Sequence, residues 1–391
     1  MLPVILLMFA AIPQLTTAQQ VGDRVCVTAT FPTKIKQKRV GQVFEGSIHT
    51  IVALSGEKWC ALEGVEGWLP LQYVMNLSDA EKHYSERIEK SSQDFAALAH
   101  RGMIHKENEE LQKAYVDLNN SLKINKKNAA TWIDRGIVFN AMGDFQRAVR
   151  DLNYAIKLNP KYANAYFNLG VVYYAVGDYD KAIELYNKAI ELNPKDPWFY
   201  ISRGSALAGK GDLKGGKDDY EKSLTINKRI ADTYIGLSNI ALAEDDLPTA
   251  YAMADKAVET QSRNAMALNH RGWVLYKQNN IDDAMFDLNR AIRYAPRLSI
   301  AWNNRAICHA ENGDFDRAIS DYDQCIELSG GSATAYGNRA VAWEGKGEFA
   351  KSKADFEKAM KLAPDQSEVL NGIAWFYSTC PDEEFRDADK A

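Results

Sequence analysis

The chain has 391 residues, of which 46% are hydrophobic and 25% are charged, and its formal net charge is −5. An acidic surface repels phosphate, so this composition argues against nucleic acid as a partner. An apolar run occupies residues 4–12, and at nine residues it is too short to span a bilayer, so no integral membrane span is expected after signal removal.

Residues 1–18 are predicted to be a signal peptide. The run 4–12 has the length of a signal-peptide core, and Thr16, Thr17 and Ala18 form a suitable cleavage site, although no Lys or Arg precedes the run. No Cys follows it, which disfavours a lipid anchor. We therefore expect an exported protein, periplasmic or extracellular.

Residues 21–77 follow the two-residue period of β-strands. Val25, Val27 and Ala29 alternate with polar or small residues, and 47–53 and 58–62 are predicted to be further strands separated by glycines. Cys26 and Cys60 fall in these strands, and the sequence leaves open whether they form a disulfide. This segment is expected to be a small all-β domain.

The end of that segment, 67–74, reads Gly-Trp-Leu-Pro-Leu-Gln-Tyr-Val and resembles the last strands and helical turn of an SH3 barrel. The resemblance implies a ligand surface at Trp59, Pro70 and Tyr73. The alternative is that these side chains are core and docking residues. A basic stretch at 34–39 stands where SH3 domains carry an acidic loop, which disfavours a Pro-rich ligand.

Residues 78–94 are predicted to be a helix that caps a repeat array. Its apolar residues stand 34 positions before matching residues of the first complete repeat: Ala80 before Ala114, Tyr84 before Leu118, and Ile88 before Leu122. This is the second half of a repeat whose first half is missing. We expect it to join the β-domain directly to the repeat array, without a flexible linker.

Residues 95–366 repeat every 34 residues without an insertion, in eight copies that begin at Phe95, Ala129, Ala163, Pro197, Ala231, Ala265, Ser299 and Ala333. Positions 8, 20 and 27 of each copy are small, and positions 4, 17 and 24 carry large apolar residues. These spacings predict two helices per copy that cross closely at the small residues. Five copies have Gly at position 15, which ends the first helix, and four have Pro at position 32, which closes the second.

This pattern resembles the tetratricopeptide repeat, a helix–turn–helix unit of the same period. The resemblance implies a mainly α protein, a right-handed helical solenoid preceded by the small SH3-like barrel. A ninth copy, 367–391, departs from the pattern at 378–381 and begins a second helix at 387–391 that never completes. An open solenoid end exposes an apolar face, so we expect that the natural chain continues or that a partner covers this end.

Arg at position 7 and Asp at position 23 vary together. Six copies carry both, and the two exceptions carry Leu169 with Leu185 and Leu237 with Met253. The two positions lie on facing helices of one repeat, so we expect six buried ion pairs. The pairs are Arg101/Asp117, Arg135/Asp151, Arg203/Asp219, Arg271/Asp287, Arg305/Asp321 and Arg339/Asp355.

Positions 2, 5, 9 and 12 form a second stripe on each first helix, which we call the groove stripe. In the tetratricopeptide family the first helices line the concave face, so this stripe is expected to face a groove. No complete copy has Lys or Arg at positions 2, 5 or 6, which disfavours a clamp for a peptide carboxylate. The expected peptide-binding residues, including asparagines at position 6, are Phe167, Tyr174, Trp198, Ile201, Trp273, Tyr276, Asn303, Asn304, Ile307 and Asn338. The alternative is that neighbouring repeats bury this stripe.

No catalytic, cofactor or metal-binding residues are predicted. Residues 204–211 approach a phosphate-binding loop but have Gly211 where a hydroxyl is required, and they do not follow a strand. The six histidines form no ligand-spaced set, and Cys308 and Cys325 replace small apolar residues of other copies. The sequence is not that of an enzyme.

Two functions are compatible with this organisation. The first is an interaction scaffold whose solenoid binds a segment of another protein. The second is an envelope protein whose SH3-like domain binds cell-wall material while the repeats act as a spacer. Self-assembly through the C-terminal end is a third, weaker hypothesis.

Overall fold

The computed structural model describes residues 24–27, 31–35, 38–43, 48–55, 59–62, 69–70 and 74–387, with side chains from 75 to 387. The chain divides into two compact units, Met1–Gly236 and Leu237–Ala391, with the boundary inside a helix. Each unit is described by itself.

Strands occur at the three places where the alternating pattern predicts them, around 25–29, 47–53 and 58–62, and the described residues contain four further strands, two of which overlap the basic stretch 34–39. A five-stranded antiparallel sheet has the order β6-β5-β4-β1-β7, and β2 pairs with β3 in a separate hairpin. The strands are β1 (Arg24–Val27), β2 (Phe31–Ile35), β3 (Lys38–Val43), β4 (Ile48–Ser55), β5 (Trp59–Leu62), β6 (Leu69–Pro70) and β7 (Val74–Asn76). These described strands form no closed barrel, so the SH3-like assignment of 21–77 stays a prediction. Residues 1–18, the predicted signal peptide, and the side chains of Cys26 and Cys60 lie outside the described residues.

The strand β7 leads directly into α1 (Leu77–Lys90), with no residue between them. Asn76, the last strand residue, caps the helix by accepting a hydrogen bond of 2.8 Å from the Asp79 N–H. Ala80 and Tyr84 of α1 are fully buried, and they pack with Ala97 and Ile104 of the next helix. The half-repeat therefore buries the residues that its register with the array predicts.

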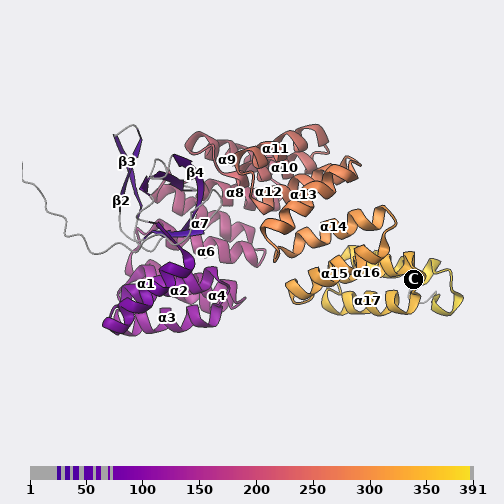
Figure 1. The fold of residues 1–391 in the computed structure, drawn as a ribbon, viewed down its shortest axis with the longest axis horizontal. Coiled ribbons are helices and arrows are strands. Elements are labelled where there is room, and N and C mark those ends of the chain that lie inside the picture. The colour runs from indigo at the N-terminus through magenta and orange to yellow at the C-terminus, as the bar shows by residue number, and fades with distance from the viewer. Residues whose placement is uncertain are drawn as a thin grey trace, which may run out of the picture. The chain divides into compact units, whose positions relative to one another are not determined.

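The rest of the described chain consists of helix pairs that stack in sequence within each unit (Figure 1). The first helices are α2 (Phe95–Glu107), α4 (Ala129–Ala141), α6 (Ala163–Ala175), α8 (Pro197–Gly209), α10 (Ala231–Ala243), α12 (Ala265–Lys277), α14 (Ser299–Glu311), α16 (Ala333–Gly345) and α18 (Ser367–Thr379). The second helices are α3 (Leu111–Ile124), α5 (Phe145–Leu158), α7 (Tyr179–Leu192), α9 (Leu213–Ile226), α11 (Leu247–Thr260), α13 (Ile281–Tyr294), α15 (Phe315–Ser329) and α17 (Phe349–Leu362). Every first helix begins at the residue where its copy begins.

The turn between the two helices of a copy requires a left-handed residue at position 15. The five glycines at this position have φ between 74° and 95°, as the sequence predicts. The other three copies place Glu109, Asp245 and Asn279 there, each with φ of 62°. The turn geometry is thus kept in all eight copies, and three of them carry the strain of a side chain in this conformation.

Small residues at positions 8 and 20 let the two helices of a copy approach closely. In the fourth copy a Cβ added to Gly204 would lie 3.0 Å from the carbonyl oxygen of Gly216, and one added to Gly216 would lie 2.9 Å from that of Gly204. Backbone atoms cannot move aside as side chains can, so this crossing tolerates only glycine without a shift of the helices.

The six predicted Arg–Asp pairs are confirmed as ion pairs. The N–O distances are 2.7 Å for Arg101–Asp117, 2.6 Å for Arg135–Asp151, 2.6 Å for Arg203–Asp219, 2.6 Å for Arg271–Asp287, 2.7 Å for Arg305–Asp321 and 2.7 Å for Arg339–Asp355. In each pair Nε and one terminal nitrogen of the guanidinium donate to the two oxygens of the carboxylate. The Asp side chains are only 1–10% exposed.

The remaining terminal nitrogen of each arginine reaches the preceding repeat, which the sequence pattern did not reveal. Its partner always stands at position 25, sixteen residues before the arginine. The partners are Ser85, Asn119, Asn187, Asp255, Asn289 and Asp323 for Arg101, Arg135, Arg203, Arg271, Arg305 and Arg339. Each arginine therefore links the two helices of its own copy and the copy before it.

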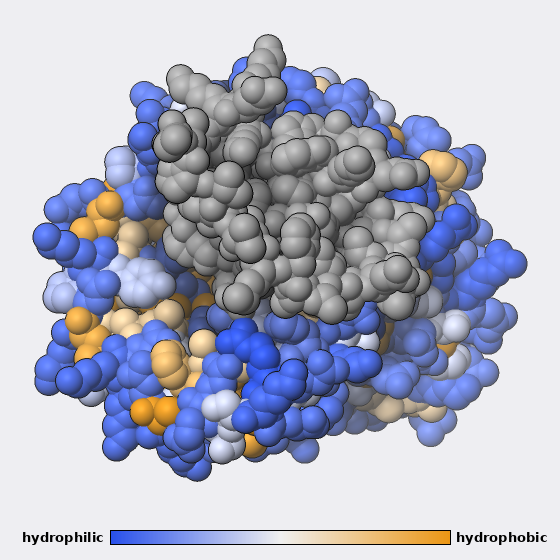
Figure 2. Space-filling model, turned by 60° about the vertical axis from the view of Figure 1, so that its left-hand side comes forward, coloured by the Kyte–Doolittle hydropathy of each residue, from blue (hydrophilic) through white to orange (hydrophobic). Residues whose placement is uncertain are grey.

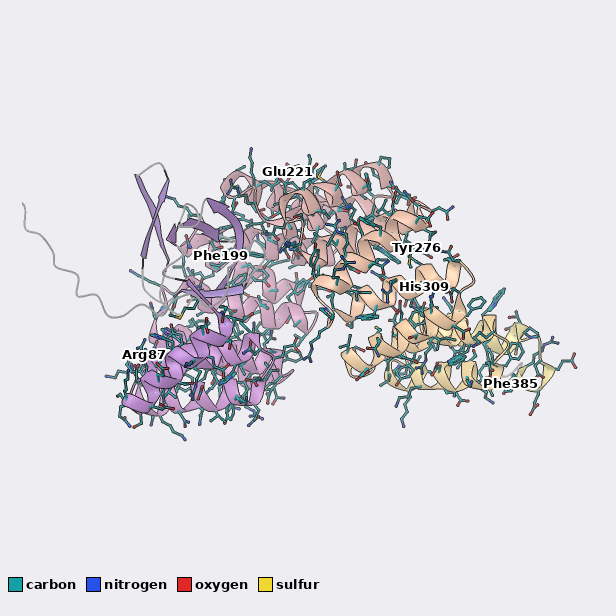
Figure 3. All side chains as sticks on the ribbon, in the orientation of Figure 1. Arg87, Phe199, Glu221, Tyr276, His309 and Phe385 are labelled. Carbon is teal, nitrogen blue, oxygen red and sulfur yellow. The ribbon has the colours of Figure 1, made fainter. Side chains whose placement is uncertain are left out.

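The C-terminal end of the array is partly covered by the chain that follows α18. After Cys380 a short 3-10 helix, η2 (Glu383–Phe385), packs Phe385 against Phe349 and Phe376, with ring centroids 6.4 and 6.3 Å apart (Figure 3). Leu370 and Trp375 of α18 are still exposed. Residues 388–391, in the segment where we expected a second helix to begin, lie outside the described residues.

The surface is predominantly hydrophilic where Figure 2 shows it, and the apolar residues there form small separate patches. No helix in the described part of the chain is both long and apolar enough to cross a membrane.

Candidate functional site

The groove stripe of the C-terminal unit carries two aromatic rings that are half-buried and stack on each other. Trp273 and Tyr276 lie three residues apart on α12, about one helical turn, and stack with their ring centroids 5.3 Å apart at 24°. Both are half-buried. The Lys277 ammonium lies 4.7 Å from the centroid of the Trp273 ring. Two predicted anchors thus form one preorganised, partly exposed aromatic surface.

A hydrogen bond to the next first helix orients Tyr276, which Figure 3 labels. Its hydroxyl donates to Glu311 Oε1 of α14 at 3.1 Å. Burial, and secondarily this bond to a carboxylate, raises the pKa of Tyr276 to about 12. The phenol therefore stays protonated near neutral pH, and the ring face is left for a ligand.

The asparagines next to these rings bond to one another. Asn304 donates to Asn269 at 3.0 Å, Asn303 to Asn304 at 3.3 Å, and Asn338 to Asn303 at 3.1 Å. The chain of amides crosses α12, α14 and α16, joining position 5 of one copy to position 6 of the next. We call these four residues the asparagine ladder.

The ladder corrects part of the expected site. Asn303 and Asn304 are 7% and 6% exposed, so the expectation that they face an open groove is wrong. Their amides satisfy each other because burial away from water requires it. Asn338 remains half-buried, and its Oδ1 accepts no hydrogen bond from the described residues. Ile307 is half-buried against the core around Tyr322.

The groove stripe of the N-terminal unit is more mixed. Tyr174 is 39% exposed and Trp198 is half-buried, as a binding surface requires. Ile201 is buried, so its expected exposure is wrong. Phe167 packs on Phe199, with centroids 5.0 Å apart, and contributes to the core. The alternative that the stripe is buried therefore holds for Ile201, whereas Phe167 is half-buried.

Position 6 carries ionisable residues in three copies, and two of them, His270 and Asp134, have strongly shifted pKa values that sequence reasoning did not single out. His270 of α12 is 8% exposed, and its Nε2 has no hydrogen-bond partner among the described residues. Burial lowers the pKa of His270 to about 4, so the ring is neutral near pH 7. Asp134 of α4 stands at the same position of the second copy, and burial raises its pKa to about 7. Both residues stand out only when the same position is compared across the repeats, because neither belongs to a sequence motif.

A hollow of about 560 Å³ opens between α3, α4 and α5 of the N-terminal unit. The Arg135 guanidinium lies 4.7 Å from the Trp132 ring centroid, and that of Arg147 lies 5.1 Å from the Phe139 ring centroid. Arg150 adds a further positive charge to the lining. The cationic hollow differs from the groove stripe, whose expected ligand contacts are aromatic and amide groups.

The predicted SH3-like surface is not described. The side chains of Trp59 and Pro70, and the whole of Tyr73, lie outside the described residues. Their role in a ligand surface stays a prediction.

Family models confirm the repeat type. Four models described as tetratricopeptide repeat match residues 133–197, 265–298, 299–330 and 333–366. None of the matching models describes an enzyme. A search of curated proteins finds no match.

Solved structures share the fold at low sequence identity. The Cut9 and Hcn1 hetero-tetramer of APC/C matches with a TM-score of 0.56 and 15% identity over 76% of this chain and 58% of the matched chain. A tetratricopeptide repeat protein from Parabacteroides merdae matches with a TM-score of 0.52 and 15% identity, over 64% of this chain and 99% of its own. An IFIT1 monomeric mutant, solved with Gppp-AAAA, matches with a TM-score of 0.58 and 12% identity over 77% of each chain. At these identities the likeness concerns the fold alone.

Proposed function

Because the chain is a tetratricopeptide repeat protein, we propose that it is a non-catalytic scaffold that binds an extended, partly apolar peptide or loop of another protein. The anchor of this peptide is the aromatic surface of Trp273 and Tyr276. The observation that carries the proposal is that these two rings are oriented by stacking and by the Tyr276–Glu311 hydrogen bond while remaining partly exposed. A rigid aromatic surface loses little entropy on binding, which is typical of interface hot spots.

The asparagine ladder connects α12, which carries the two rings, to the neighbouring first helices α14 and α16. Most of its amides bond to one another and are not available to a ligand. Its buried amides hold the first helices α12, α14 and α16 in register. Only Asn338 offers an accepting oxygen, at the end of the ladder, to a peptide N–H. The ligand therefore gains its affinity chiefly from apolar side chains on the two rings, with few backbone hydrogen bonds.

A double substitution with a matched control tests the proposal. A peptide is first selected on the full chain from a phage-displayed random library, and its dissociation constant is measured by fluorescence anisotropy. Trp273→Ala with Tyr276→Ala is expected to weaken binding by about 2 kcal/mol or more, roughly thirtyfold. The melting temperature is expected to change little, because both rings are already partly in water.

The control changes two exposed aromatics of the same unit that lie outside the groove stripe. Phe286 and Tyr294 on α13 are 62% and 42% exposed, and cations lie over both rings, as Lys277 lies over Trp273. Phe286→Ala with Tyr294→Ala is expected to leave the dissociation constant unchanged. Equal loss in both double variants, or no loss in the first, refutes the proposed anchor.

We also propose that the protein acts after export, since residues 1–18 have the pattern of a signal peptide. Mass spectrometry of the mature N-terminus tests this, and a chain that retains residues 1–18 contradicts it. The envelope-protein alternative rests on the SH3-like pattern of Trp59, Pro70 and Tyr73. Co-sedimentation of the full chain with purified cell wall, lost in Trp59→Ala, favours that alternative.

A further inference from the structure

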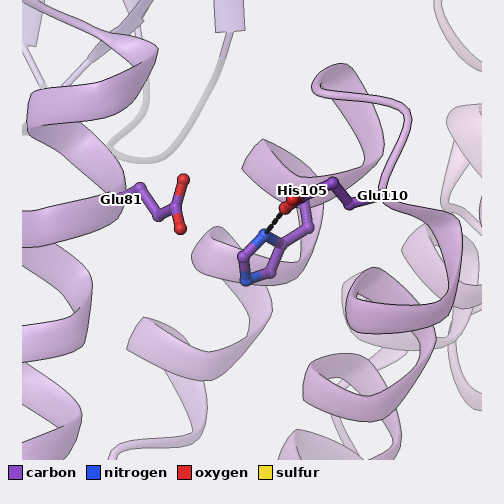
Figure 4. A group of neighbouring side chains, drawn as sticks. All are labelled: Glu81, His105 and Glu110. Carbon is purple, nitrogen blue, oxygen red and sulfur yellow. Dashed lines mark hydrogen bonds and ion pairs between the residues drawn. The ribbon is translucent and has the colours of Figure 1, made fainter.

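Three metal-ligating side chains from separate elements meet at the N-terminal end of the array (Figure 4). Glu81 belongs to α1, His105 to α2, and Glu110 is the residue before α3. One potential ligand atom from each lies within 4.8 Å of the other two. In Figure 4 the Glu81 carboxylate points from α1 toward the His105 ring, and His105 Nδ1 lies 2.7 Å from Glu110 Oε2.

The positions of these residues in the repeat explain why they meet and why they match no sequence motif for metal binding. Glu81 stands at position 21 of the half-repeat, His105 at position 11 and Glu110 at position 16 of the first copy. Positions 21 and 11 of consecutive copies also meet in the next repeat, where the Tyr115 and Phe139 rings lie 5.6 Å apart. The three donors are 24 and 5 residues apart along the chain, which matches no local metal motif.

A second feature, outside the three donors, orients the histidine. His105 is 6% exposed, and its Nε2 lies 3.6 Å from Asp117 Oδ2. Arg101 holds that carboxylate at 2.7 and 2.8 Å. Histidines that bind metal through one ring nitrogen usually face a carboxylate with the other, which determines the tautomer and the ring plane. His105 has a related arrangement: Nε2 faces Asp117 at 3.6 Å, slightly beyond hydrogen-bond distance, and Nδ1 is directed at Glu110.

Glu110 is also available for a ligand role. In five copies position 16 is an Asp whose side chain caps the second helix, as Asp144 and Asp314 do. Glu110 makes no such cap bond, and its carboxylate turns instead to His105 and to Lys113, whose Nζ lies 2.6 Å from Oε1. The Lys113 ammonium and a bound cation would therefore compete for the Glu110 carboxylate.

We propose that Glu81, His105 and Glu110 bind a divalent first-row transition cation, such as Zn²⁺, and that this ion ties the half-repeat to the first complete repeat. One nitrogen and two carboxylate ligands suit Zn²⁺, with a water molecule in the fourth position. In a tetrahedral site, ligand atoms at 2.0–2.2 Å from the ion lie roughly 3.3–3.6 Å from one another, so ligand atoms up to 4.8 Å apart close by up to about 1.5 Å. Both glutamates are only half-buried and are able to make this movement.

The seventh copy provides a matched control within the same chain. His309 stands at position 11, and its Nε2 lies 3.9 Å from Asp321, as that of His105 faces Asp117. Its partners at positions 21 and 16 are Met285 and Asp314, and Asp314 caps α15. The seventh copy therefore has a histidine beside the same aspartate but lacks the two glutamates that face His105.

Isothermal titration of the full chain with Zn²⁺ tests the proposal. We expect one ion per chain, with affinity reduced about tenfold or more in His105→Gln and in Glu81→Gln, and unchanged in His309→Gln. Zn²⁺ is also expected to raise the melting temperature of the native chain and not that of Glu81→Gln. Melting temperatures in EDTA show whether each variant folds, and Glu81→Gln provides the test even if His105→Gln does not fold.

Removing the positive charge of Lys113 distinguishes a metal site from a network of ion pairs that only stabilises the fold. Lys113→Gln is expected to bind Zn²⁺ several times more tightly, because Glu110 is released. Absence of titratable Zn²⁺ binding, equal binding by His105→Gln and His309→Gln, or binding by Lys113→Gln that is no tighter than that of the native chain overturns the proposal.

Discussion

Two kinds of repeat build the same helix crossing in this chain. Six copies join their helices through a buried Arg–Asp pair, whereas the third copy places Leu169 and Leu185 at the same two positions, both buried. The geometry of the crossing is therefore compatible with either an ion pair or an apolar pair. The burial of a fully hydrogen-bonded pair gains little over apolar packing, so stability alone does not explain six retained pairs.

The difference lies in what the arginine does beyond its own copy. Arg135 reaches back to Asn119 of the preceding repeat at 3.0 Å, and Leu169 has no group with which to reach Asn153. Asn153 instead donates to the Val149 carbonyl of its own helix. The comparison indicates that the Arg–Asp pair serves the register between copies as much as the packing within one.

The largest effect is expected when one half of a pair is removed. Asp287→Leu leaves the Arg271 guanidinium without its buried partner, and we expect a loss of about 3–5 kcal/mol in the free energy of opening of α12 and α13. The lower end applies because Asp255 remains 2.5 Å from Arg271. Adding Arg271→Leu recreates the third-copy arrangement and is expected to recover most of the loss. Hydrogen exchange of peptides from these helices measures it, and equal protection in the single and double variants contradicts the account.

The reverse exchange sharpens the comparison. Leu169→Arg with Leu185→Asp installs the pair in the third copy, where Asn153 stands ready at position 25. We expect the double variant to lie within about 1–2 kcal/mol of the native chain, because a complete pair roughly balances apolar packing. Leu185→Asp alone is expected to cost several times more, since it buries an unpaired carboxylate. Urea denaturation measures the free energy of unfolding of the single and the double variant. Similar destabilisation of both would falsify the idea that the crossing accepts either an ion pair or an apolar pair.

A further effect is expected from two titratable groups at position 6, Asp134 and His270, and its sign differs between the two units. The pKa of Asp134 is raised to about 7 from its ordinary 3.8, so its proton is bound in the folded chain and stability falls as pH rises from about 4 to 7. The pKa of His270 is lowered to about 4 from 6.5, so stability falls as pH drops from 6.5 to 4. At about 1.4 kcal/mol per pKa unit the full shifts correspond to about 3–4 kcal/mol each, which is an upper limit because solvent contact and local relaxation reduce them.

Hydrogen exchange in α4 and α12 at several pH values separates the two groups. Asp134→Asn is expected to abolish the loss of protection in α4 at higher pH, and His270→Gln the loss in α12 at lower pH. The two variants serve as controls for each other, because each leaves the other unit unchanged. A pH profile that neither substitution alters shows that other groups dominate the titration.

The sequence alone was sufficient for everything that depends on period. Gly204 and Gly216 marked a close crossing, Ala80 and Tyr84 marked the half-repeat, and the shared variation of Arg and Asp marked contacts sixteen residues apart. Each of these follows because an uninterrupted 34-residue repeat places equal positions in equal surroundings. The left-handed turn at Glu109, Asp245 and Asn279 was not predicted, since these residues depart from the glycine that normally announces it.

Tertiary structure decided which side chains of the groove stripe remain exposed and which distant groups meet. Ile201 and Asn303 belong to the same groove stripe as Trp273, yet both are buried in the structure. Periodicity within one helix contains no information on how deeply a neighbouring helix packs against it. The meeting of Glu81, His105 and Glu110 depends on the stacking of α1 on α2, a distance that no spacing along one helix reports. Repetition thus specified the helices and their crossings, and the packing of unlike side chains between copies determined where a ligand or an ion is able to bind.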